Sequence, residues 1–178
     1  APAPVGESGY STLERQWTRP TLEVNGLWGG YQGPGHKSVI ASEAFAKITC
    51  RLVTAQDPAD IRHKVAQHLE KHCPAGVTLD IMPDTHGASA YHIGSTHKGL
   101  EVAQYALRSV YNQNPLIVRM GGTLPIATAF KNLFDMDMVF FSFSTADEDF
   151  HAPNEFFRIQ RLYDGLKAWA LYWEELAE

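Results

Sequence analysis

The sequence contains few cysteines, and this excludes one class of small protein. Cys50 and Cys73 are the only two among 178 residues. Two cysteines cannot form the multi-disulfide framework of a small secreted domain, nor do they form a zinc knuckle. We expect two reduced, buried thiols, which suits a cytoplasmic protein.

Long apolar runs and positive charge are also scarce. No apolar run approaches the roughly 20 residues that a membrane span needs, so we expect no membrane contact. The 15 Lys and Arg residues against 20 Asp and Glu give a net charge of -5. This balance argues against a nucleic-acid partner, which requires a basic face. With 44% hydrophobic residues, the chain has enough apolar side chains for a core.

The first half of the chain contains alternating segments and one helix. Residues 21–27 alternate apolar and polar side chains, as a half-buried strand does. Residues 44–53 form a second alternating segment, with a slip in phase that suggests a bulge. Asp57 suits the N-cap of a helix and Pro58 its first turn, and residues 73–76 end that helix.

This helix and the segment after it suggest a known arrangement. Ile61, Val65 and Leu69 form one apolar stripe on the helix. Residues 77–82 again alternate as a strand does. The order strand, strand, helix, strand is three-quarters of a ferredoxin-like β-α-β-β-α-β sandwich, whose first strand and helix would lie upstream.

After Pro83 the pattern changes to helices alternating with buried apolar runs. This order is typical of an α/β layer fold, so we predict the α/β class with a boundary at residue 83. The predicted helices cover residues 98–111, 124–134 and 154–176, and the predicted strands cover residues 116–118 and 138–143. The second strand is apolar throughout, as expected for a strand buried on both faces.

His151 is the residue most suggestive of chemistry. It lies in an acidic turn between a predicted strand and a predicted helix, a place where α/β folds put ligand sites. A neutral imidazole binds Zn²⁺ well, and nearby carboxylates can orient it. A single histidine also fits an exposed capping role, so spacing alone leaves both interpretations open.

The other histidines favour a metal site less. Three of them, His86, His92 and His97, are not spaced to share one helix face. His68 and His72 form an i, i+4 pair without a third ligand, which indicates a solvated helix face.

Several segments resemble, in order, motifs of the M20 family of zinc-dependent peptidases, especially its carnosinase-like branch. They are Arg19–Gly33, His36–Ile40, Ile48–Val53 with Gln56–Pro58, Arg119–Ile126 and His151–Glu155. The resemblance extends from about residue 9 to residue 175. In that family, a catalytic domain binds two zinc ions and a lid domain dimerises the enzyme.

The resemblance implies a role for several residues. It implies that residues 1–83 are the second half of the lid and that residues 84–178 are the C-terminal segment of the catalytic domain. His151 would ligate one zinc ion, and Arg51 would bind the substrate carboxylate with its guanidinium fork. The remaining implied substrate contacts are Ser38, the Gly121 and Gly122 backbone, and Thr123. Without the resemblance, Arg51 reads as a surface charge and Gly121–Thr123 as a turn with a helix cap.

The family's other zinc ligands and its general base have no counterpart in these 178 residues. One ligand cannot hold a catalytic zinc ion. We therefore expect a C-terminal fragment of a homodimeric metallopeptidase for dipeptides or short peptides, inactive by itself and with no catalytic residue of its own. The alternatives are a dimerisation module and a non-catalytic protein that binds a carboxylate or a peptide.

Overall fold

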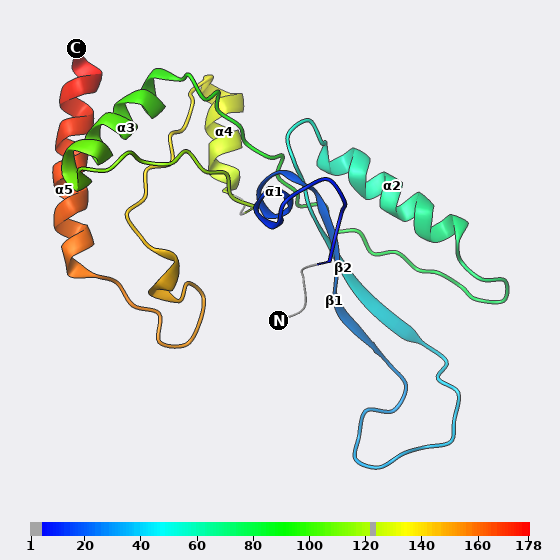
Figure 1. The fold of residues 1–178 in the computed structure, drawn as a ribbon. Helices are drawn as coiled ribbons and strands as arrows, with labels where there is room; N and C mark the ends of the chain where they lie inside the picture. The colour runs from blue at the N-terminus through cyan, green and yellow to red at the C-terminus, as the bar shows by residue number, and fades with distance from the viewer. Residues whose placement is uncertain (1–4, 122–123) are drawn as a thin grey trace. The chain divides into compact units, whose positions relative to one another are not determined.

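The computed structural model describes residues 5–121 and 124–178 and divides into two compact units (Figure 1). The first contains the chain up to Tyr91 together with Arg119–Thr128, and the second contains His92–Val118 and Ala129–Glu178. The described residues contain helices and a small antiparallel sheet, which places the chain in the α/β class as predicted.

The sheet of the first unit is a hairpin of two predicted strands. β1 (Thr21–Gly29) pairs antiparallel with β2 (Ala44–Arg51), which confirms both strands. The bulge was predicted in the second strand, and this was wrong. The register shifts between Val24 and Gly26, so the extra residue belongs to β1.

Two helices accompany the hairpin. α2 (Pro58–Lys71) confirms the predicted helix, and the Asp57 carboxylate accepts hydrogen bonds from the two backbone N–H groups of its first turn. α1 (Thr12–Thr18) was not predicted from the sequence. Its signal was present: Ser11 and Glu14 form a capping box.

No residue of β1, β2 or α2 is buried. A pocket of about 210 Å³ lies between the hairpin and α2, lined among others by Leu22, Cys50, Ile61 and Val65. Both cysteines are unpaired, but they are half-buried rather than fully buried as predicted. Even this partial burial raises the pKa of the Cys50 thiol. The apolar stripe of α2 therefore meets the sheet without completing a core.

Three predicted strands are not formed. The structure assigns no strand to residues 77–82, 116–118 or 138–143. A strand exists only when its backbone N–H and C=O groups pair with a neighbour, and these segments form no ladder with each other or with the hairpin. Alternation of side chains indicates which face a segment can bury, but the partner decides whether it becomes a strand.

The second unit contains the main hydrophobic core. α3 (Lys98–Tyr111) and α5 (Ile159–Ala177) pack side by side (Figure 1). The core members are Val102, Ala103 and Ala106 of α3 and Ala168 and Tyr172 of α5, with Val139, Phe141 and Phe143 packed against them. Residues 138–143 thus bury one face rather than both, because Phe140 remains exposed.

The helix ends differ from prediction at one point. α3 and α4 (Pro125–Phe134) match the predicted helices, whereas α5 begins at Ile159 instead of residue 154. The turn before it uses left-handed backbone, with Asn154 at φ 66°, which no helix continues through. A short 3₁₀ helix, η1 (Ala146–Glu148), precedes this turn. In the described part of the chain, no helix is long and apolar enough to cross a membrane.

Candidate functional site

Two of the predicted substrate-binding segments meet in the first unit. Arg51, the last residue of β2, donates a hydrogen bond from Nη1 to the backbone carbonyl of Gly121 at 2.9 Å. The two residues are 70 positions apart in the sequence. The Arg51 side chain is exposed, so the rest of its fork faces solvent and can bind a carboxylate.

Gly121 itself is closely packed on one side. A Cβ atom there would lie 2.7 Å from the backbone oxygen of Gln16, in the helix α1. A glycine is therefore required for this approach of two backbones. The Gly121 backbone therefore accepts the hydrogen bond from Arg51 through its carbonyl and also contacts α1.

The remaining predicted substrate contacts are less defined. Ser38 lies exposed in the connection between β1 and β2. Gly122 and Thr123 lie outside the described residues. The structure therefore brings Arg51 and Gly121 together, and the roles of all five predicted substrate-binding residues stay predictions.

His151, the predicted zinc ligand, lies in the second unit in an exposed loop. All residues from 149 to 157 are exposed. Asp149, His151 and Asn154 have φ values of 54°, 59° and 66°. Left-handed backbone is uncommon for non-glycine residues, although Asp, Asn and His adopt it more readily than most. The loop therefore folds through an unusual sequence of turns that presents the His151 side chain to solvent.

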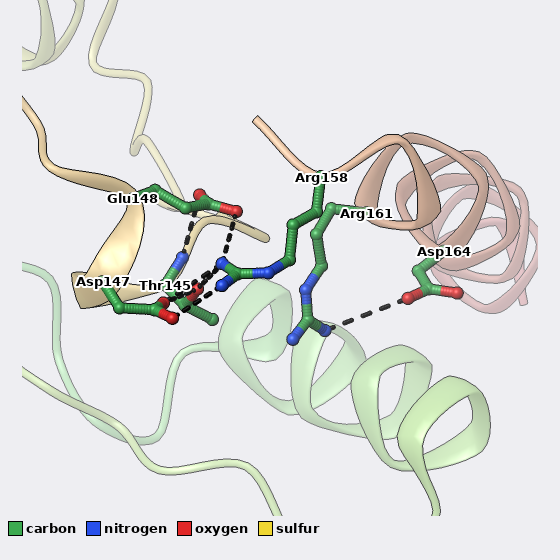
Figure 2. Close-up of polar contacts among 6 residues, drawn as sticks. All are labelled: Thr145, Asp147, Glu148, Arg158, Arg161 and Asp164. Carbon is green, nitrogen blue, oxygen red and sulfur yellow. Dashed lines mark hydrogen bonds and ion pairs between the residues drawn. The ribbon is translucent and has the colours of Figure 1, made fainter. Parts of the chain in front are cut away.

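A polar cluster closes the base of this loop (Figure 2). Arg158, just before α5, donates from Nη1 to Thr145 Oγ1 at 2.9 Å and to Glu148 Oε1 at 3.2 Å. Its Nη2 donates to Asp147 Oδ2 at 2.6 Å. Glu148 is only 1% exposed, and its other oxygen accepts the backbone N–H of Thr145. We call Thr145, Asp147, Glu148 and Arg158 the loop latch.

Charge and hydrogen bonding in the loop latch favour the ionised carboxylate of Asp147. The Arg158 guanidinium, and after it the Thr145 hydroxyl, lower the pKa of Asp147 from 3.8 to about 2. The same bond raises the pKa of Arg158. The acidic residues around His151 are evident in the sequence, whereas the role of Arg158 is not. The only signal was an arginine ten residues after a glutamate, and that spacing corresponds to no local motif.

Two of the other histidines, His97 and His86, have structural partners. His97 caps α3, because its Nδ1 accepts the N–H of Gly99 at 3.1 Å, while its Nε2 lies 3.6 Å from Asp137. His86 bonds to Asp84 at 2.8 Å through Nδ1, and hydrogen bonds from His86 lower the pKa of that carboxyl.

The donor atoms of the described residues do not make a zinc site. Within residues 5–121 and 124–178, no group of three or more His, Cys, Asp or Glu side chains could hold a metal ion. A catalytic zinc ion needs about three protein ligands and a water molecule. His151 could supply one of them, so a complete site would require further ligands, and no chemical step follows from this chain's residues alone.

Comparisons with known proteins agree on one family. The peptidase dimerisation domain of the M20 family matches residues 4–77. The Cys-Gly metallodipeptidase dug1 of Schizosaccharomyces pombe is 26% identical over 168 residues, covering 93% of this chain and 35% of its own length. The chain thus spans about a third of the length of the curated relatives it matches.

Solved structures share the fold as well as the sequence. Human carnosine dipeptidase 1 aligns with a TM-score of 0.72 at 27% identity, over 93% of this chain and 35% of that protein. The M20 family metallo-carboxypeptidase Sso-CP2 from Sulfolobus solfataricus aligns with a TM-score of 0.79 at 26% identity, over 94% and 39%. Since both structural alignments cover over nine-tenths of the chain, the chain is similar across both units to M20 family metallopeptidases.

Proposed function

We propose that this chain is part of a metallopeptidase that hydrolyses dipeptides or short peptides. The observation that supports this most is the hydrogen bond from Arg51 to Gly121 at 2.9 Å. It joins two segments that separately resemble the family's substrate-binding motifs. A guanidinium anchored on one side by a carbonyl keeps donors for a substrate carboxylate on the other.

The proposal assigns each part of the chain a place in the intact enzyme. Residues 1–83 are the second half of the lid, and residues 84–178 are the C-terminal segment of the catalytic domain. The match of residues 4–77 to a peptidase dimerisation domain supports a homodimer formed through the lid. The relatives carry the names Cys-Gly metallodipeptidase and Beta-Ala-His dipeptidase, which supports short peptides as substrates.

The cofactor and the location follow from the same proposal. Zinc, two ions in the family enzyme, would be bound with His151 as the one ligand from this chain. When bound, zinc activates water for attack on a carbonyl. Ser38, Gly121, Gly122 and Thr123 would hold the substrate alongside Arg51. The two unpaired cysteines support a cytoplasmic location.

The first test compares the source protein with the isolated 178-residue chain. Intact mass and N-terminal sequencing establish whether the source polypeptide is longer. Both proteins are then assayed for hydrolysis of Cys-Gly and β-Ala-His, with added Zn²⁺ and with a chelator. We expect chelator-sensitive hydrolysis by a longer source protein and none by the isolated chain. Equal activity of both would contradict the fragment proposal, and no activity in either would contradict the peptidase proposal.

A variant tests the substrate contact. Replacing Arg51 by lysine keeps the charge but removes the fork, so we expect KM to rise about 10-fold with kcat nearly unchanged. Arg62→Lys is the matched control in the same unit, because the Arg62 guanidinium bonds to the carbonyl of Asp84 instead. A KM unchanged in Arg51→Lys would remove Arg51 from substrate binding.

A further inference from the structure

The loop that carries His151 has almost no packing to hold its shape. Every residue from 149 to 157 is exposed, and three non-glycine residues have left-handed backbone. Its internal support consists of backbone hydrogen bonds, from Ala152 N–H to Asp149 and from Glu155 N–H to Ala152. Such a segment samples other conformations unless its two ends are fixed.

The loop latch fixes both ends. Thr145, Asp147 and Glu148 precede the loop, and Arg158 follows it. One guanidinium bonds to all three of these side chains at 2.6–3.2 Å. A further bond, from the Phe156 N–H to the Glu148 carbonyl at 3.2 Å, crosses the base of the loop.

Burial sets Glu148 apart from a surface ion pair. The residue is 1% exposed, and both of its carboxylate oxygens have a donor, Arg158 on one and the Thr145 N–H on the other. Burying a carboxylate costs desolvation energy that an ion pair seldom recovers in net stability, whereas it fixes geometry. The cluster also lies outside the apolar core between α3 and α5.

We propose that Arg158, acting through Glu148 and Asp147, is a positioning residue that holds the loop in the single conformation that presents His151. The consequence for activity rests on the proposed function, in which His151 belongs to the active site. The conformational consequence does not, because it follows from the geometry of the loop latch alone.

Hydrogen exchange on the source protein tests the conformational part. In Arg158→Gln, we expect the amides of Ala152 and Phe156 to exchange at least 10-fold faster, while the amides of α3 and α5 keep their protection. Arg158→Lys should recover only part of the protection, because one compact ammonium group with three donors cannot reproduce the four hydrogen bonds that Arg158 makes from two guanidinium nitrogens. Asp147→Asn, which keeps the Glu148 pair, gives a milder variant in case Arg158→Gln does not fold.

Arg161 provides a matched control. It lies three residues later, and its guanidinium contacts Asp164 at 3.9 Å instead of the acidic residues of the loop latch (Figure 2). The same guanidinium lies over the Tyr111 ring. Arg161→Gln should leave the loop amides unchanged. If Arg158→Gln speeds exchange in α3 and α5 as much as in the loop, or if both variants act alike, Arg158 is a general stabiliser and the proposal fails.

Kinetics test the consequence for activity. In a hydrolytically active source protein, we expect Arg158→Gln to lower kcat at least 10-fold with KM nearly unchanged, because the predicted carboxylate contact belongs to Arg51. An unchanged kcat, together with a loosened loop, would show that the loop conformation does not serve catalysis. A wild-type protein without hydrolysis would refute the proposed function, and the exchange result would still decide whether the loop latch holds the loop.

Discussion

At the scale of single residues, Gly121 offers a direct test of the first unit. A Cβ added there would lie 2.7 Å from the Gln16 carbonyl oxygen, a contact that backbone atoms cannot easily relieve. We expect Gly121→Ala to lower the free energy of unfolding by about 1–3 kcal/mol, the usual cost of forcing an extra methyl group into a closed space. Urea unfolding measures this change.

Gly94→Ala is the matched control for this substitution, because nothing lies within 4 Å of the added Cβ. There the reduced freedom of the unfolded chain should leave stability unchanged or raise it by about 0.4–1 kcal/mol. Equal effects at both positions would show that the contact of Gly121 with α1 is absent in solution.

Asp147 gives the loop latch a predictable dependence on pH. Its pKa falls from 3.8 to about 2, mainly because Arg158 donates a hydrogen bond to it. A lowered folded-state pKa means that its contribution is fully present above about pH 4 and is lost as the pH falls through about 2. We expect the protection factor of the Phe156 amide to decrease over this range, as measured by hydrogen exchange.

Two observations keep this prediction separate from general acid unfolding. The amides of α3 should retain their protection over the range in which Phe156 loses its own. In Asp147→Asn, which has no carboxyl to titrate, the Phe156 protection factor should start lower and lose this step. A step of the same size in Asp147→Asn would assign the effect to another group.

At the scale of secondary-structure elements, the crossing of α3 and α5 depends on small residues. Ala106 and Ala168 are fully buried, and a Cβ on Gly165 would lie 3.2 Å from the Phe143 ring. We expect Ala168→Leu to cost about 1–3 kcal/mol by overpacking. Ala170→Leu, on an exposed position of the same helix, should stay within about 0.5 kcal/mol. Thermal unfolding followed by circular dichroism measures the melting temperature of each variant. Similar decreases in both variants would show that the Ala168 face of α5 does not pack against α3.

The elements that the sequence predicted best are those with local causes. Asp57 caps α2 through hydrogen bonds to residues two and three positions away, and a stripe of period near 3.6 marks its apolar face. Both the cap and the apolar stripe depend only on residues that are close together in the sequence, so they can be predicted from it. Residues 77–82 have the alternation of a strand, but its partner is not in the hairpin, so no strand forms.

In the candidate site, too, local features could be predicted from the sequence and contacts between distant residues could not. His151 and Arg51 could be selected from motifs, each within a few residues of sequence. The hydrogen bond of Arg51 to Gly121 and the bonds of Arg158 across the loop join residues far apart in sequence, and only the folded chain shows them. Left-handed backbone at His151 was equally hidden, because Asp, Asn and His tolerate it without requiring it.

At the scale of the whole molecule, the exposed surface is large for the mass. The chain exposes 14184 Å² at 19.8 kDa. Two compact globular units of half this mass would together expose only roughly 10,000 Å², whatever their arrangement. Part of the excess is apolar, including Leu27, which is 78% exposed on β1, and Met82, which is 84% exposed. Apolar surface on this scale normally lies against another protein surface.

The isolated chain should therefore associate through this surface. We expect sedimentation velocity to show mass increasing with concentration, together with strong binding of an apolar dye such as ANS, because exposed apolar groups gain free energy by leaving water. Leu27→Glu should weaken association by placing a charge on the hairpin. Val5→Glu is the matched control, since Val5 is exposed but lies outside the elements of the hairpin. A monomer that does not bind the dye at any concentration would show that the hairpin buries its apolar residues within the chain itself.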